Sequence, residues 1–146
     1  MAEKNTSTIG FEKQIWEAAC VLRGNMDASE YKSVVLGLIF LKYISDRFEA
    51  KHRELVEEGG GFEEDRDEYT AENICFVPEQ ARGPVIAAGA HRPEVGALID
   101  EAMGAIEKEN RRLEGILPKN FARPELDKRR LGEVVDLFTN IQMVEH

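Results

Sequence analysis

The residue types that most often perform chemistry are scattered along this chain. Its three histidines, His52, His91 and His146, lie in different segments, and none has the H-x-x-x-H spacing that places two imidazoles on one helix face. Cys20 and Cys75 lie outside any C-x-x-C pair, so we interpret them as reduced structural thiols. The sequence therefore predicts neither a metal site nor a disulfide framework.

Two further patterns resemble parts of active sites, but each has a simpler interpretation. Gly59-Gly60-Gly61 lacks the Lys-Ser/Thr pair of a phosphate-binding loop and precedes acidic residues, so it favours a flexible linker. The carboxylate pairs Asp100-Glu101 and Glu107/Glu109 fall on the polar side of a patterned helix, where solvated surface acids are the simpler interpretation. We assign no catalytic and no cofactor-binding residue from the sequence.

The distribution of charge is more informative. The 146 residues carry 19 basic and 28 acidic side chains, a net charge of −9, which excludes a protein whose whole surface is basic. Residues 111–130 reverse this balance, with seven basic and three acidic side chains. They are either a surface for DNA phosphates or an ordinary solvated helix start. The candidate DNA-contacting residues are Lys119, Arg123, Lys128, Arg129 and Arg130.

Helical periodicity dominates the remaining pattern. Apolar residues recur at helical spacing in four segments, which are 11–22, 28–56, 93–110 and 124–141. Each of the last two segments follows an arginine and opens with Pro-Glu, and we expect the proline at the first helical position. The second segment is the longest and is apolar on nearly all faces, so other helices must surround it.

Between the second and third helices the pattern weakens. The acidic segment 57–72 is expected to be a solvated, mobile loop. Residues 74–77 precede Pro78 and predict a short extended segment, a candidate edge strand, and the glycines and proline of 83–89 predict irregular backbone. The expected fold class is an all-α bundle of four or more helices with a long central helix and one short extended segment near 74–77.

Aromatic residues are spread around the second helix. We expect core packing for most of Tyr31, Phe40, Tyr43 and Phe48, whereas Trp16 on the first helix either edges the core or faces a partner. Because the second helix is apolar on more than one stripe, part of it is expected to be buried by a neighbouring domain or subunit. This pattern favours an interaction module over a free-standing enzyme.

The sequence has no feature of a membrane or secreted protein. Its longest apolar run, residues 34–41, is far shorter than the roughly 20 residues needed to cross a bilayer. The N-terminal residues are polar and lack the apolar core of a secretion signal. We expect a cytoplasmic protein in which residues 1–10 form a disordered tail.

Several stretches carry a family resemblance. Residues 11–19 (FEKQIWEAA), 22–27 (LRGNMD) and 30–46 resemble the N-terminal helical domain of the modification (methyltransferase, HsdM-type) subunit of type I restriction-modification systems. Further similar stretches extend the resemblance over nearly the whole chain from Phe11 onward; they are residues 76–78, 106–110, 113–119 and 131–140.

The resemblance implies a role in adenine-specific DNA methylation with S-adenosylmethionine as the cofactor of the full-length protein. The Asn/Asp-Pro-Pro-Phe/Tyr motif that holds a flipped adenine does not occur here, so the family pattern places the reaction in a following α/β domain. Residues 11–146 are then a non-catalytic N-terminal domain without a cofactor of its own. The implied partners are its own C-terminal catalytic domain, the specificity and restriction subunits, a second modification subunit and DNA.

Two other functions stay open at this point. An independent helical adaptor, unrelated to methylation, predicts a gene that stops near His146, whereas a methyltransferase subunit predicts continuation into a cofactor-binding domain. A small standalone enzyme requires an active site that the residue pattern does not provide.

Overall fold

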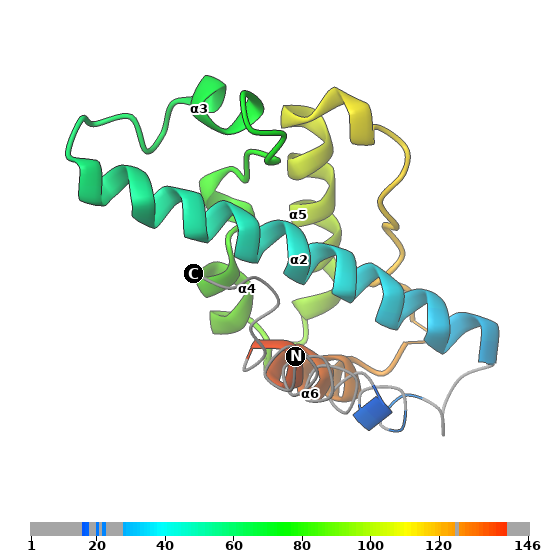
Figure 1. Ribbon diagram of the computed structural model, residues 1–146. Helices are drawn as coiled ribbons and strands as arrows, with labels where there is room; N and C mark the ends of the chain where they lie inside the picture. The colour runs from blue at the N-terminus through cyan, green and yellow to red at the C-terminus, as the bar shows by residue number, and fades with distance from the viewer. Residues whose placement is uncertain (1–15, 18–19, 21, 23–27, 125, 140–146) are drawn as a thin grey trace, which may run out of the picture.

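The computed structural model describes residues 16–17, 20, 22, 28–124 and 126–139, and within these residues it is helical and contains no strand (Figure 1). The predicted all-α fold is therefore confirmed. Positions 16, 17, 20 and 22 are helical, while the rest of the predicted first helix and residues 1–10 lie outside the described residues. The remaining helices are α2 (Ala28–Glu58), α3 (Arg66–Thr70), α4 (Gly83–Ala88), α5 (Val95–Glu109) and α6 (Lys128–Thr139), with short 3-10 turns at Glu79–Ala81 and Arg111–Leu113.

Helix α2 is the long element that the sequence predicts. Its 31 residues span roughly 46 Å, at about 1.5 Å per residue. In Figure 1 it runs across the front of the molecule, with α5 behind it and α6 below. The helix ends where Gly59 takes a φ of +77° and its N–H donates to the carbonyls of Leu55 and Val56, as expected for a glycine that terminates a helix.

The core lies where α5 and α6 meet the segments around them. Fully buried side chains from these two helices include Ile99, Met103, Ile106, Leu131 and Val134. Two glycines allow close approach: a Cβ at Gly96 or Gly132 would lie 2.2 Å from the carbonyl oxygen of Phe121 or Ala90, respectively. Any larger residue at these two positions would push the neighbouring backbone away.

The acidic segment is anchored rather than a purely solvated loop. It contains α3, whose Tyr69 is fully buried and stacks on Phe48 of α2 with 4.8 Å between ring centroids. Arg82 covers the other side of this cluster, 4.7 Å from the Phe48 ring centroid, and donates to the Glu64 carboxylate at 2.7 Å. These hydrogen bonds from Arg82 hold the pKa of Glu64 below its usual range.

The edge strand considered for residues 74–77 does not form. The side chain of Asn110 takes the place of a neighbouring strand: its Oδ1 accepts from the Phe76 N–H at 3.0 Å, and its Nδ2 donates to the Phe76 carbonyl at 2.9 Å. Because one side chain satisfies both backbone groups of Phe76, the segment is held against the end of α5 without pairing to another strand.

The two Arg-Pro-Glu sequences precede their helices instead of starting them. The Val95 N–H donates to the Arg92 carbonyl at 3.1 Å, and the Leu126 N–H donates to the Arg123 carbonyl at 3.2 Å. Each proline therefore occupies the second position of a β-turn, a position that proline favours. The expectation of proline at the first helical position is wrong for α5 and α6. The irregular backbone expected for residues 83–89 is also wrong, because α4 forms there with Pro84 in its first turn, a position that proline tolerates.

Candidate assembly surface and basic segment

One face of α2 is apolar although no described element covers it. Leu36, Phe40 and Tyr43 follow each other at four- and three-residue spacing, so they form one stripe along the helix, and 56%, 46% and 44% of their surfaces are exposed. We call these three residues the α2 stripe. The core face of the same helix lies opposite and carries Val34, Leu38, Leu41 and Phe48. A helix at a solvated surface normally presents polar residues on its outer side.

Basic side chains flank the α2 stripe. Lys32, one turn before Leu36, is exposed, and Arg47, one turn after Tyr43, contacts the Tyr43 hydroxyl at 3.5 Å. An exposed group of aromatic and aliphatic residues with a polar rim is the usual composition of a protein interface. The stripe is therefore the best candidate for a docking surface in the described residues.

The expectation that most aromatic residues lie in the core holds only in part. Phe48 is buried and Tyr31 packs against the core, whereas Phe40 and Tyr43 are exposed and that expectation is wrong for them. Trp16, for which the sequence allows either the edge of the core or a surface that faces a partner, is 65% exposed. The described residues leave part of the apolar surface of α2 exposed, and the expectation that a neighbouring domain or subunit buries it stays a prediction.

Carboxylates of α5 hold the basic segment that follows it. Asp100 accepts the N–H groups of Phe121 and Ala122 at 2.9 and 3.0 Å, and the buried Glu107 accepts the N–H of Leu117 at 2.8 Å. Their interpretation as solvated surface acids is wrong. In the sequence, Asp100 and Glu107 are seven residues apart on one helix and precede a segment without helical periodicity. The backbone N–H groups of such a segment need acceptors, and this is the signal that could have identified the two carboxylates.

The structure divides the five candidate DNA-contacting residues. Lys119 pairs with the carboxylate of Glu107. Glu107 is seven residues after Asp100, or about 10 Å further along α5. Lys128 donates to the carbonyls of Arg123 and Leu126 at 2.6 and 2.7 Å, so it closes the turn before α6. Arg123, Lys128, Arg129 and Arg130 lie around the start of α6, since Lys128 binds the Arg123 carbonyl, whereas Lys119 pairs with a carboxylate of α5.

The start of α6 combines these charges with a helix end. Asp127 caps the helix by accepting the N–H groups of Arg129 and Arg130 at 2.9 and 3.4 Å. The Arg129 side chain is exposed, and that of Arg130 lies 3.6 Å from the Asp127 carboxylate. Basic side chains in the first turn add to the positive end of the helix dipole, so this end of the molecule favours anions.

Comparison with known proteins decides the family. The HsdM N-terminal domain family matches residues 11–138, most of the chain. The chain belongs to this family. It is also 31% identical over 147 residues to a type I restriction enzyme MjaIX methylase subunit of Methanocaldococcus jannaschii. That match covers 90% of this chain and 26% of the relative, so this HsdM N-terminal domain spans about a quarter of the relative's length.

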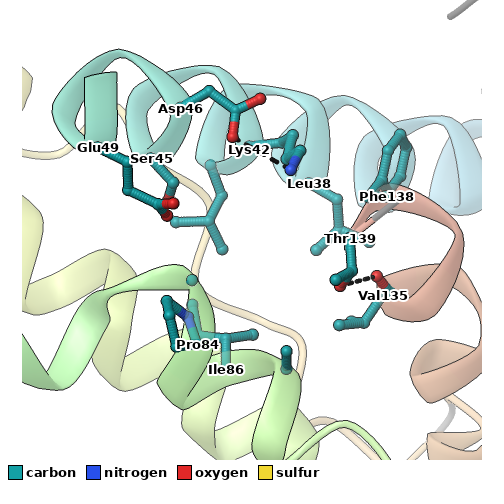
Figure 2. Close-up of a pocket in the computed structure, with 13 residues that line it drawn as sticks. Leu38, Lys42, Ser45, Asp46, Glu49, Pro84, Ile86, Val135, Phe138 and Thr139 are labelled. Carbon is teal, nitrogen blue, oxygen red and sulfur yellow. Dashed lines mark hydrogen bonds and ion pairs between the residues drawn. The ribbon is translucent and has the colours of Figure 1, made fainter. Parts of the chain in front are cut away.

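One cavity of the HsdM N-terminal domain lies between α2, α4 and α6 (Figure 2). Its wall is mainly apolar, and its polar side chains include a Lys42–Asp46 ion pair. In the part of the chain that the structure describes, no cluster of His, Cys, Asp and Glu could hold a metal ion, and no helix is long and apolar enough to span a membrane.

Glu107 gives this HsdM N-terminal domain a pH-dependent contact. Burial opposes ionisation of the carboxyl, but the Lys119 ammonium and the Leu117 N–H outweigh it and hold the pKa of Glu107 below its usual value. A lowered pKa in the folded state stabilises the fold above the unfolded pKa, about 4.3, and this stabilisation is lost as the pH falls through the folded value.

We therefore expect Glu107→Gln to lower the free energy of unfolding by about 1–3 kcal/mol at pH 7, and by less as the pH approaches 3. Urea unfolding at both pH values measures the difference. Glu101→Gln, on an exposed position of the same helix, is the control and should change little at either pH. Equal effects of Glu107→Gln at the two pH values would contradict the assignment.

Proposed function

We propose that this HsdM N-terminal domain is a non-catalytic assembly domain of a type I DNA methyltransferase subunit. The single observation that carries the proposal is the exposed apolar α2 stripe on a domain that matches a quarter of a methylase subunit. Docking of the remaining polypeptide, the catalytic domain, on this stripe would remove it from water. Residues 11–146 form the domain in this proposal, residues 1–10 are a disordered tail, and the subunit works in the cytoplasm.

The proposed chemistry belongs to the whole subunit. The full-length protein transfers a methyl group from S-adenosylmethionine to adenine in DNA, in an assembly with specificity and restriction subunits and a second modification subunit. Titrating S-adenosylmethionine into the 146-residue chain is expected to give no saturable heat, because the proposal places the cofactor site in the remaining polypeptide of the subunit. Saturable binding would overturn the assignment of the cofactor to the rest of the protein.

We also propose that the assembled enzyme contacts DNA phosphates through the start of α6. Arg129 is exposed at the positive end of the helix, so it is the contact residue that the geometry favours most, and the half-buried Arg123 and Arg130 lie beside it. Lys128 adds charge from the same turn, although its ammonium is bound to carbonyls. Lys119 contributes least because the Glu107 carboxylate neutralises it.

The DNA proposal predicts a defined salt effect. Replacing Arg129 and Arg130 together by glutamine in the assembled enzyme should weaken duplex binding and reduce the slope of log affinity against log salt by about 2, one for each lost phosphate contact. Fluorescence anisotropy at several salt concentrations measures the slope. Arg111→Gln with Arg112→Gln is a matched control, because these exposed arginines lie at the other end of α5 (Figure 1). If both pairs give the same slope as the unaltered enzyme, the start of α6 does not face DNA.

An independent helical adaptor is the alternative function. The α2 stripe is compatible with it, since an adaptor also needs a docking surface. The family membership and the greater length of the relative favour the methylase subunit. Sequencing the gene beyond the codon for His146 separates the two, because only the methylase subunit requires a cofactor-binding domain downstream.

A further inference from the structure

Within the described residues, no ion pair neutralises the two cations that flank the α2 stripe. The Arg47 guanidinium contacts the neutral Tyr43 hydroxyl at 3.5 Å and lies 6.0 Å from the centre of the Tyr43 ring. No described carboxylate lies within ion-pair distance of Lys32 or Arg47. By contrast, Lys42 on the same helix pairs with Asp46 at 3.1 Å. The two flanking cations therefore keep their charge available for a partner.

The stripe side of α2 carries no exposed carboxylate over most of its length. Between positions 31 and 50, the exposed side chains of the helix are Lys32, Ser33, Leu36, Phe40 and Tyr43. The two carboxylates of this stretch, Asp46 and Glu49, line the cavity of Figure 2 instead. Glu54 is the first exposed carboxylate further along this side, and it already lies 3.7 Å from the Lys51 ammonium. In a chain with a net charge of −9, an apolar and positive face is a local exception.

The positions of the two cations define a pattern that a partner must match. Lys32 and Arg47 are separated by 15 positions, or about 22 Å along the helix, with the α2 stripe between them. Apolar and aromatic anchors supply most of the affinity of an interface, whereas charges at its rim set the register of the partner. Two cations at this separation are few for a nucleic acid, which needs a dense row of them.

We infer that the face that docks on the α2 stripe is a protein surface of the remaining polypeptide, with an apolar centre and two carboxylates about 22 Å apart. One carboxylate pairs with Lys32 and the other with Arg47, and together they set the register of this face along α2. The inference rests on the docking proposed above and adds the chemistry of the face that docks. A second copy of the chain and a nucleic acid are the other occupants that the experiments distinguish.

Zero-length cross-linking of the full-length subunit tests the two pairs. A water-soluble carbodiimide condenses an amine with a carboxylate that touches it, and the carbodiimide takes up the water that is lost. We expect Lys32 to be joined to an Asp or Glu beyond residue 146, and Arg47→Lys to add a second link to the same face. Lys108, exposed on α5, is the control lysine and should not be joined to that face. Links from Lys32 to a second copy, or no link from it, would overturn the inference.

Charge reversal gives a second readout in the full-length subunit. Lys32→Glu with Arg47→Glu is expected to accelerate proteolytic release of the domain about tenfold at low salt, because repulsion replaces each ion pair. The acceleration should shrink at high salt, which screens exposed charges. Lys108→Glu with Arg92→Glu makes the same change in net charge at exposed positions outside α2, and it should leave the rate unaltered.

The outcomes separate this inference from the docking itself. If charge reversal has no effect while serine substitution of the α2 stripe releases the domain, docking stands and the inference fails. If neither set of substitutions releases the domain, both fail. If charge reversal weakens duplex binding and leaves the release rate unaltered, the two cations face DNA and the inference is overturned.

Discussion

Replacing Tyr69 by alanine is expected to lower the free energy of unfolding by about 3–5 kcal/mol, as for other buried aromatic residues. Tyr69 is fully buried, stacks on Phe48, and meets Phe76 edge to face with 5.4 Å between ring centroids. Its hydroxyl donates to the Glu63 carbonyl at 2.6 Å, and burial raises the pKa of Tyr69 to about 12. The substitution leaves a cavity between α2 and α3 and releases the acidic segment.

Denaturant unfolding followed by circular dichroism measures this loss. Tyr69→Phe keeps the ring and removes only the hydrogen bond, so it should cost about 1 kcal/mol. Phe62→Ala, at an exposed position of the same acidic segment, should stay within about 0.5 kcal/mol of the unaltered chain. If Tyr69→Ala costs no more than Phe62→Ala, the acidic segment is not anchored to α2 as described.

The helices and their ends were largely predictable from local rules. The periodicity of α2 and α5, the stop at Gly59 and the end of α5 near Asn110 all follow from patterns within a few residues. The starts of α5 and α6 were less predictable because the same Arg-Pro-Glu sequence suits a β-turn and a first helical turn equally well. Whether the sequence forms the turn or the helix depends on where the next apolar residue packs in the core.

The errors come from contacts between distant residues. No local rule indicates that Asn110 binds Phe76, 34 positions earlier, and thereby replaces a strand neighbour. In the same way, Asp100 and Glu107 have the sequence pattern of surface acids until a later segment folds against them. Polar residues that bind backbone groups of another segment are therefore the hardest to assign from sequence.

The candidate docking surface was predictable as a property of α2 but not as a set of residues. The sequence shows that α2 is apolar on more than one face, which predicts a covering neighbour. Which apolar face stays open depends on where α6 and the segment 114–127 pack. Gly37 shows this packing, because a Cβ there would lie 2.7 Å from Pro118 and 2.9 Å from Phe121. Pro118 and Phe121 therefore cover α2 at Gly37, while Phe40 stays 46% exposed.

Disruption of the α2 stripe is expected to undock the domain from the rest of the full-length subunit. Replacing Leu36, Phe40 and Tyr43 by serine should shift the docking equilibrium by at least about 2 kcal/mol, or roughly 30-fold, because aromatic anchors dominate interface energies. The fold of the domain itself should survive, since these side chains already face solvent. Limited proteolysis then releases the domain about 30-fold faster, because cleavage follows the population of the open form.

Val56→Ser with Phe62→Ser provides the control for this experiment. These residues are also exposed and apolar but lie outside the stripe, so they should leave the cleavage rate unchanged. Equal acceleration by both sets of substitutions would mean that general surface polarity, and not the stripe, governs release. Circular dichroism of the isolated 146-residue chain checks that each variant is folded.

Protection of position 40 tests the central claim most directly. A Phe40→Cys variant with Cys20→Ser and Cys75→Ser is labelled with a maleimide, both as the 146-residue chain and within the full-length subunit, and Glu133→Cys on the exposed side of α6 serves as the reference. We predict that position 40 reacts freely in the 146-residue chain and at least about tenfold more slowly in the full-length subunit, while position 133 reacts alike in both. Equal labelling of position 40 in the two proteins would contradict docking through the α2 stripe.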